Sequence, residues 1–467
     1  MGRPGRIAAV LAGAALVGTG LSVAPATAAA PAPGAAGGGD PYFPAAGNGG
    51  YQISHYDLDL TYDPASRALS ARANLIGSTT TALRSFNLDL RDLTVSRVTV
   101  NGRSAAFSQA DGELVVTPRS PLQARRPFVV SVAYGGTTGQ PEDITGALYG
   151  WVSFDDGAFV GNEPEGASTW YPVNDVPYDK ATYSFDVTVP AGTVAVGNGE
   201  LVSKKTRGGW TTWRWVAVNP MASYLSMAAT GDYTLTTTRT ASGLPIINAV
   251  DKDLSAADLA TTQASLAQQP AMIDFFSKLF GRYPFTSFGA VVDDDEEAGY
   301  ALENQTRPIY SGAPSEGTVA HELAHQWYGD KVTPRQWKDI WLNEGFATYA
   351  EWLWTEHRGG DTLQESFDAA YARPATSGFW QVLPADPGAE DLFAGAVYDR
   401  GAMTLQVLRT TIGDRAFFTL LKRWAARDLH RPATTGQFLA LAEQVSGRQL
   451  DALFDTWLYT AGKPALP

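Results

Sequence analysis

The spacing of apolar residues changes near residue 253 of this chain, and that change sets its fold class. Upstream, apolar and polar residues alternate in short runs, as at 56–62 and 183–189, which is typical of half-buried β-strands. Downstream, helical spacing dominates, around residues 273–280, 316–329, 339–357, 398–412, 415–427 and 450–460. We therefore predict an α+β multidomain chain, with an all-β domain (a sandwich or saddle) at 48–240 and a mainly helical domain with a small sheet at 241–467.

Composition excludes several classes of protein. Hydrophobic residues make up 44% of the 467 residues and aromatic residues 11%, enough to bury a large core, so a disordered chain is excluded. Lys and Arg number 35 against 48 Asp and Glu, a formal net charge of −13, which argues against a nucleic-acid partner. The chain has no Cys, so disulfides, thiolate metal sites and cysteine nucleophiles are excluded.

The first thirty residues have the layout of a secretory signal peptide. Arg3 and Arg6 precede an uncharged apolar run at 7–23, and small residues ending at Ala28 or Ala30 offer cleavage sites. We expect a secreted, extracellular protein without a stable membrane span in the mature chain; the alternative is a retained membrane anchor. Residues 31–47, rich in Gly and Pro, are expected to form a flexible leader.

The strongest chemical signal is an H-E-x-x-H sequence at 321–325. On a helix, His321 and His325 lie on one face, about one turn apart, and two imidazole nitrogens can then bind one Zn²⁺ at about 2.1 Å. Glu322 is rotated about 100° from His321 and can act as general base on a water molecule. The alternative is a core helix that happens to carry two His, but two of the chain's five His lie here.

A second acidic signal completes a metal site. Eighteen residues separate His325 from Glu344, which lies in an Asn-Glu-Gly sequence at the start of the next helical stretch. Two His and one Glu leave a fourth coordination position open, which is typical of catalytic rather than structural zinc. The sequence therefore predicts one catalytic Zn²⁺ per chain, held by His321, His325 and Glu344.

This pair of motifs resembles the gluzincin aminopeptidases of the aminopeptidase N type. The resemblance implies an N-terminal β domain followed by a thermolysin-like catalytic domain, with the metal ligands and the general base at the positions given above. It extends over residues 50–467 and includes a sequence at 169–181, Thr-Trp-Tyr-Pro-Val-Asn-Asp-Val-Pro-Tyr-Asp-Lys-Ala, that is similar to a family signature of the β domain.

Two further motifs imply substrate-binding and catalytic residues. The sequence Tyr-Ala-Leu-Glu-Asn ending at residue 304 is similar to the family's Gly-Ala-Met-Glu-Asn motif, so Glu303 is implied to bind the free α-amine of the substrate. Glu163 lies where some members have a second amine-binding residue. Tyr398, in Tyr-Asp-Arg-Gly-Ala, is implied to stabilise the oxyanion of the tetrahedral intermediate. The alternatives are solvated loop carboxylates and an ordinary helix tyrosine.

The chain also departs from the family pattern. Leu302 stands where the family has Met, which concerns the floor of the first side-chain pocket, and Arg400 stands where it has Lys. The sequence ends where the catalytic domain is expected to close, so the resemblance implies a short form without the C-terminal helical-repeat domain of many members.

The segment between the two domains' motifs carries two more predictions. Ala301 belongs to a short stretch, 301–304, that is expected to form an edge strand and to pair with the substrate backbone. The acidic run at 293–297, Asp-Asp-Asp-Glu-Glu, is expected to be a solvated loop; alternatively it binds Ca²⁺ or attracts cationic substrates.

The expected function is that of a secreted zinc aminopeptidase acting on peptides with a free N-terminus. Two alternatives stay open: a zinc endopeptidase or another zinc hydrolase, for example of epoxides, and a non-catalytic zinc-binding interaction module. Comparing the cleavage of N-acetylated and free peptides would distinguish an aminopeptidase from the first alternative. Loss of peptidase activity in Glu322→Gln, with zinc still bound, would exclude the second.

Overall fold

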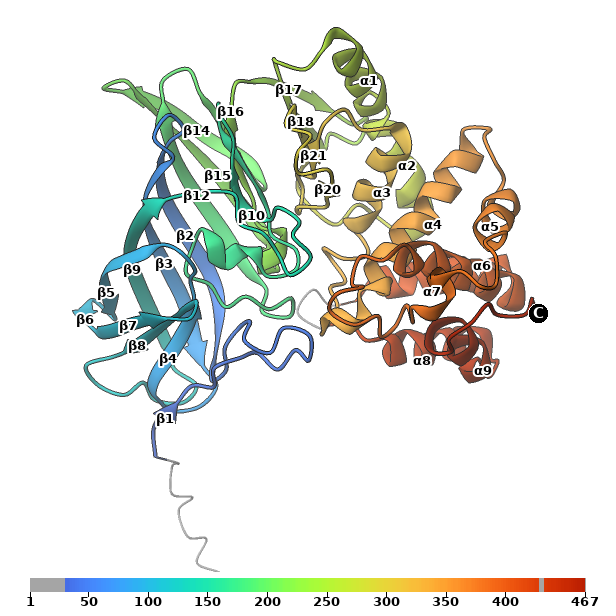
Figure 1. The fold of residues 1–467 in the computed structure, drawn as a ribbon, viewed down its shortest axis with the longest axis horizontal. Helices are drawn as coiled ribbons and strands as arrows, with labels where there is room; N and C mark the ends of the chain where they lie inside the picture. The colour runs from blue at the N-terminus through green and yellow to red at the C-terminus, as the bar shows by residue number, and fades with distance from the viewer. Residues whose placement is uncertain (1–29, 428–431, 467) are drawn as a thin grey trace, which may run out of the picture. The chain divides into compact units, whose positions relative to one another are not determined.

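The computed structural model of this protein describes residues 30–427 and 432–466. The predicted signal peptide at 1–30 lies outside this range, apart from residue 30. The predicted order of a β domain followed by a mainly helical domain with a small sheet is confirmed (Figure 1). Among the described residues, no helix combines the length and the apolar character needed to cross a bilayer.

Three sheets build the β domain. The largest has eight strands in the order β14-β15-β12-β2-β3-β9-β5-β6, and two four-stranded sheets run β1-β4-β8-β7 and β10-β11-β16-β13. The strands are β1 Ala32–Pro33, β2 Tyr51–Asp63, β3 Ala68–Thr79, β4 Leu83–Asp89, β5 Thr94–Val100, β6 Arg103–Ser104, β7 Ala106–Ala110, β8 Glu113–Thr117, β9 Pro127–Thr137, β10 Gly150–Ser153, β11 Ala158–Gly161, β12 Ala181–Pro190, β13 Val194–Gly197, β14 Glu200–Arg207, β15 Trp210–Met221 and β16 Ala228–Gly231.

The predicted alternation fixes which side of the large sheet is buried. In β2, every apolar residue of the 56–62 run is buried, while the intervening residues are wholly or partly exposed. Strands β2 and β12 pair in parallel with Tyr56 opposite Tyr183, and their rings stack with centroids 4.9 Å apart. The apolar face thus forms an aromatic core, because successive strand residues point to opposite faces.

The segment 31–47 differs from the flexible leader expected for it. It pairs with β4 through β1, Asp89 accepts a hydrogen bond from the main chain of Gly47 (3.1 Å), and Phe43 is buried. Its glycines permit close packing: a Cβ at Gly47 would lie 2.1 Å from Val176. The Gly/Pro composition therefore reflects tight packing against the β domain rather than flexibility.

The second half starts with a five-stranded mixed sheet, in the order β17-β18-β19-β21-β20. Its strands are β17 Tyr233–Arg239, β18 Pro245–Asp251, β19 Phe288–Asp293, β20 Ala301–Leu302 and β21 Ile309–Ser311. Because β17 belongs to this sheet, the structural boundary lies before residue 233, slightly upstream of the expected position near 240. The predicted edge strand at Ala301 is present as β20.

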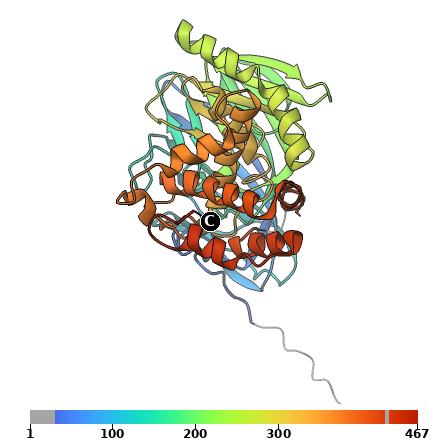
Figure 2. The same ribbon diagram turned by 90° about the vertical axis from the view of Figure 1, so that its right-hand side faces the viewer.

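Nine α-helices follow or flank this sheet within the described ranges, and Figure 2 shows them in front of the β-strands. They are α1 Ala256–Leu266, α2 Gln269–Phe280, α3 Glu316–His325, α4 Trp341–His357, α5 Leu363–Tyr371, α6 Gly401–Ile412, α7 Asp414–Ala425, α8 Thr435–Ser446 and α9 Asp451–Phe454. Local signals set the ends of these helices: the Ser255 side chain caps α1 by accepting a hydrogen bond from the main chain of Asp258, and α2 ends at Gly281, where φ is +103°.

The two domains meet through main-chain groups next to the metal motif. Lys180, from the 169–181 sequence, donates hydrogen bonds to the carbonyls of Asp330 (2.7 Å) and Lys331 (3.0 Å), just after α3. Tyr224 donates to the carbonyl of Gly329 (3.2 Å), and Asp40 accepts from the main chain of Trp337 (2.8 Å). These contacts fix the β domain against the loop that connects α3 and α4.

Candidate active site

Helices α3 and α4 bring the three predicted metal ligands together. Ser315 caps α3 by accepting a hydrogen bond from Thr318 (3.0 Å), and His321 and His325 then occur one turn apart with ring centroids 4.9 Å from each other. Glu344 lies in the first turn of α4. Its Oε2 lies 3.2 Å from Nε2 of His321 and 3.4 Å from Nε2 of His325.

This donor set fits zinc. Two imidazole nitrogens and one carboxylate oxygen are ligands that Zn²⁺ prefers, and the three donor atoms lie within 4.8 Å of one another. Around a tetrahedral ion with bonds of about 2.1 Å, donors are separated by about 3.4 Å, close to the 3.2 Å and 3.4 Å that separate Oε2 of Glu344 from His321 and His325. The three donors therefore have the spacing of ligands that share one ion.

A hydrogen bond at the opposite ring nitrogen orients His325, and a nearby carboxylate lies at the opposite nitrogen of His321. Nδ1 of His325 lies 3.1 Å from the carbonyl of Tyr328 and donates to it, which leaves Nε2 free to bind a cation. Nδ1 of His321 lies 3.7 Å from Oε2 of Glu351, two turns after Glu344 on α4. Both rings are thus held with Nε2 facing the same point.

Electrostatics at these ligands indicate that the site is built for a cation. Burial alone would lower the pKa of both histidines, but the interactions of the His321 ring with the carboxylates of Glu344 and Glu351 raise the pKa of His321 well above its usual value. For His325, burial is likewise outweighed by the charges of Glu344 and Glu303, which raise its pKa to about 9. Burial would raise the pKa of Glu344, yet His325 and His321 lower it to about 2.

Glu322 lies beside the donor set without belonging to it. Its side chain is buried, and its carboxylate lies within 4.8 Å of ligand atoms of His325 and Glu303. Burial raises the pKa of Glu322 to about 7, against the lowering effect of the two histidines. A carboxyl group in this position can accept and return a proton near neutral pH.

Two carboxylates from different domains face the same point. Glu303 follows β20 in the second half, and Glu163 follows β11 in the β domain, yet oxygens of both lie within 4.8 Å of an oxygen of Glu344. Oε1 of each is buried and has no hydrogen-bond partner among the described residues. Burial raises the pKa of both carboxyl groups, and the charges of Glu303 and Glu344 raise that of Glu163 further.

Tyr398 lies above the metal ligands in a turn of π-helix, Ala396–Arg400, that leads into α6. Its ring stacks on His321 with centroids 6.0 Å apart. Burial and the surrounding carboxylates raise the pKa of Tyr398 well above 10, so its hydroxyl stays neutral and can donate a hydrogen bond. Wide π-turns are frequent at functional sites.

Arg400 holds this turn in place rather than lining the site. Its guanidinium is fully buried and donates hydrogen bonds to four carbonyls, those of Trp380 (3.1 Å), Val382 (3.2 Å), Thr456 (3.1 Å) and Thr460 (2.5 Å). The Arg that replaces the family's Lys thus fastens the Tyr398 turn to the C-terminal segment.

One cavity of about 370 Å³ collects all the candidate residues. It is lined by the metal ligands, by Glu322, Glu303, Glu163 and Tyr398, and by β20 with Ala301 and Leu302. The structure therefore brings every predicted site residue to one cavity between the β domain and the helical domain. Leu302, which replaces the family's Met, keeps a buried apolar position in this lining.

The acidic run at 293–297 lies outside this arrangement. Asp293 ends β19 and accepts a hydrogen bond from Tyr233, while Asp294, Glu296 and Glu297 are exposed. Within the described ranges, the groups of three or more residues that could share a metal ion all lie in the His321 cluster. The predicted Ca²⁺ site is therefore not supported.

Three residues of the site could not be singled out from the sequence. Glu351 orients His321, and its only signal was the spacing of seven residues from Glu344, which places both on one helix face. Gln326 donates from Nε2 to the main-chain carbonyl of Glu303 (3.2 Å) and so links the segment that carries Glu303 to the end of α3. Asp330 is fully buried with both carboxylate oxygens unpartnered, and no local pattern marks it.

Comparison with known proteins agrees with this geometry. The chain matches the peptidase family M1 domain over residues 265–457 and the peptidase M1 N-terminal domain over residues 52–225. The crystal structure of the M1 zinc metallopeptidase from Deinococcus radiodurans superposes with a TM-score of 0.85 at 30% identity, covering 92% of this chain and 98% of that chain. A variant of that protein, solved bound to a Tyr-Ser-Ala substrate, gives a TM-score of 0.85 at 29% identity, over 92% and 99% of the two chains.

Curated relatives are longer. Aminopeptidase M1-D of Oryza sativa subsp. japonica is 25% identical over 448 residues, which is 88% of this chain and 50% of the relative. Mouse glutamyl aminopeptidase is 27% identical over 357 residues, or 69% and 37% of the two chains. The chain thus spans about half the length of these relatives, or less. With its nearly complete overlap with a two-domain neighbour, the chain belongs to peptidase family M1.

Proposed function

We propose that this protein is a secreted zinc-dependent aminopeptidase that removes the first residue from peptides. The observation that carries the proposal is a pair of carboxylates, buried Glu303 and half-buried Glu163, beside the His-His-Glu donor set; one oxygen of each is buried and accepts no hydrogen bond from the described residues. Buried carboxylates are costly without a cationic partner, and the protonated α-amine of a peptide supplies one. An amine fixed there places the first peptide bond next to the metal ligands and Glu322.

Each residue then has one task. His321, His325 and Glu344 would hold the Zn²⁺, which when bound would supply a Lewis acid for activating water and polarising the scissile carbonyl. Glu322 accepts a proton from the attacking water and returns it to the leaving amine. The neutral hydroxyl of Tyr398 donates a hydrogen bond to the oxyanion of the tetrahedral intermediate.

The substrate main chain is held from two sides. Carboxylates Glu303 and Glu163 clamp the amine, while β20 offers its free edge as an extra strand partner for the peptide backbone. The structure of a related M1 zinc metallopeptidase bound to Tyr-Ser-Ala supports a peptide as the substrate class.

The test compares free and blocked substrates on the mature chain. Aminoacyl amides with a chromogenic leaving group should be hydrolysed, a chelator should abolish this activity, and Zn²⁺ should restore it. Matching N-acetylated amides should not be cut. Equal rates on free and acetylated substrates would overturn the aminopeptidase proposal and favour an endopeptidase, and hydrolysis that survives complete zinc removal would overturn the metal mechanism.

Secretion has its own test. Residues 1–30 carry the positive head, apolar run and small-residue cleavage sites of an exported protein. The full chain, expressed in a secreting bacterial host, should accumulate in the medium with a new N-terminus after Ala28 or Ala30. Retention in the membrane fraction with Met1 intact would contradict the proposal.

A further inference from the structure

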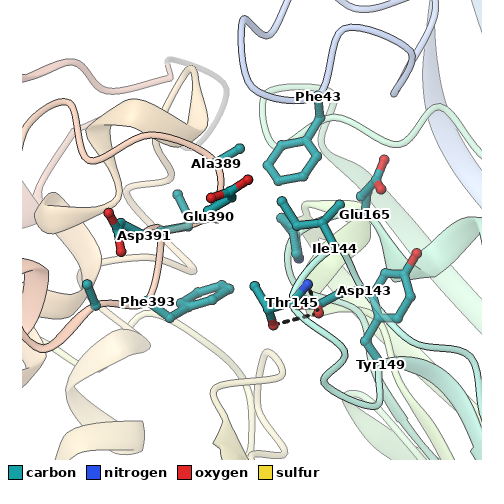
Figure 3. Close-up of a pocket in the computed structure, with 13 residues that line it drawn as sticks. Phe43, Asp143, Ile144, Thr145, Tyr149, Glu165, Ala389, Glu390, Asp391 and Phe393 are labelled. Atoms are coloured by element: carbon teal, nitrogen blue, oxygen red, sulfur yellow. Dashed lines mark hydrogen bonds between the residues drawn. The ribbon is translucent and has the colours of Figure 1, made fainter.

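We propose that a second cavity beside the metal site recognises a cationic side chain, that of arginine or lysine, on the first residue of the substrate. This inference rests on the proposed aminopeptidase function. The cavity, here called the acidic subsite, has a volume of about 230 Å³, and Phe43, Asp143, Ile144, Glu165, Glu390 and Phe393 are among its lining residues (Figure 3).

The acidic subsite adjoins the amine-binding end of the active-site cavity. Asp143, Thr145, Tyr149 and Phe393 line both cavities. Pro164, in the subsite wall, directly follows the proposed amine anchor Glu163. Because the amine and the side chain of the first residue leave the same carbon atom, an amine held at Glu163 directs that side chain toward the subsite.

The charge of the subsite is one-sided. Four of its 13 lining residues are acidic and none is Lys, Arg or His. Arg91 approaches Glu165 (3.7 Å) and partly neutralises it. Glu390 is exposed, has no ion pair or side-chain hydrogen bond among the described residues, and extends its carboxylate across the cavity toward Ile144 (Figure 3). Glu390 is therefore the free anion that an incoming cation would meet.

Apolar side chains line the approach to this anion. Ile144 is 58% exposed and Phe393 is 37% exposed, although both are large hydrophobic residues. Both line the same cavity, so an apolar stem that covered them there would bury hydrophobic surface. Arginine and lysine have long apolar stems that end in a positive head, so one side chain satisfies both the apolar walls and the carboxylate.

The N-terminal segment holds the wall that carries Glu390. Tyr42 donates a hydrogen bond to Asp386 and accepts one from the main chain of Gly388 (3.0 Å), directly before the lining residues at 389–394. The neighbouring Phe43 lines the subsite itself, and it precedes residue 52, where the match to the family begins. The subsite thus combines the family's cavity with a segment outside the matched region.

The first test uses substrates that differ only in charge. Arginyl and citrullinyl amides with the same fluorogenic leaving group have side chains of nearly equal shape, and so do lysyl and N-acetyl-lysyl amides. We expect kcat/KM to favour the cationic member by about fivefold at low salt, because an exposed ion pair contributes modestly. The preference should fall in salt of about 0.5 M, where screening is strong.

The second test removes or reverses the charge of Glu390. Glu390→Gln should abolish the preference, and Glu390→Lys should invert it toward neutral and acidic side chains, while activity on leucyl amide changes little. Glu142→Gln is the matched control, since Glu142 is exposed on the same rim but lines neither cavity, and it should keep the preference.

Two results would overturn the subsite. They are equal rates on arginyl and citrullinyl amides in the unaltered protein, and a preference that persists in Glu390→Lys. If leucyl amide is hydrolysed in either case, the subsite alone fails. If no amide is hydrolysed by the zinc-loaded protein, the proposed function fails as well.

Discussion

The two halves of the active site are built in different ways. The metal ligands come from α3 and α4, two helices that follow each other directly, so His321, His325 and Glu344 are within 23 positions in sequence and meet within 3.4 Å. The amine-side carboxylates come from different domains: Glu163 and Glu303 are joined only because the β domain packs against the loop after α3. The position of the metal ligands therefore depends on local helix geometry, whereas the position of the two carboxylates proposed to bind the substrate amine depends on the packing of the domains.

The sharpest test of the helix-borne half is Glu322→Gln. Because this change removes the proposed general base but keeps the shape of the side chain, we expect kcat/KM on aminoacyl amides to fall by about 10³-fold. Zinc content, measured by elemental analysis, should stay at one ion per chain. Glu296→Gln serves as the control, since Glu296 is exposed in the acidic run. Activity within tenfold of the unaltered protein would refute the assigned role.

The helix-borne half was also the half that the sequence could predict. Helical spacing places His321 and His325 on one face whatever surrounds them, and Glu344 follows from its place in the first turn of α4. The change of apolar spacing near residue 253 likewise predicted the β domain and the helical domain, because alternation is typical of strands and a helical spacing is typical of helices.

Features that depend on packing between distant segments could not be predicted from local sequence patterns. Glu163 reaches the site only through the packing of its loop, and its role rested on resemblance alone. The composition of segment 31–47 predicts a flexible leader, but Asp40 and Tyr42 accept hydrogen bonds from the main chain of Trp337 and Gly388, 297 and 346 positions away. The acidic subsite is lined by residues of three separate segments, around Phe43, 143–165 and 389–394, so no single stretch of sequence predicts it.

A second prediction compares the two carboxylates of the packed half. Glu303→Gln should lower kcat/KM by about 100-fold and Glu163→Gln by about tenfold, because each removes a charge-assisted contact to the amine. The effect of Glu303 is expected to be larger, since it is 2% exposed and Gln326 links its main chain to the end of α3. The discrimination against N-acetylated amides should weaken in the same order, and an unchanged discrimination in both variants would show that neither residue binds the amine.

A third prediction concerns how the ligands are oriented. Glu351→Gln should weaken zinc binding by about tenfold, because Glu351 lies 3.7 Å from Nδ1 of His321 and polarises that ring toward the metal. Competition with a chromophoric zinc chelator measures the affinity. At saturating Zn²⁺ the activity should return to near its original level. A loss of activity that excess Zn²⁺ does not repair would instead give Glu351 a direct part in catalysis.

The smallest effect is expected where carboxylates cluster without being enclosed. Asp294→Asn in the acidic run should change the free energy of unfolding by less than about 0.5 kcal/mol, and added Ca²⁺ should leave the melting temperature unchanged, because Asp294 is exposed. The acidic run and the Glu163–Glu303 pair contain the same kind of side chain, but only in the pair does each residue have a buried carboxylate oxygen that accepts no hydrogen bond from the described residues. If Ca²⁺ stabilised the protein through this run, clustering of carboxylates alone would be enough to make a cation site. Burial of the carboxylate oxygens would then not be what distinguishes the proposed amine-binding pair, Glu163 and Glu303, from an exposed acidic loop.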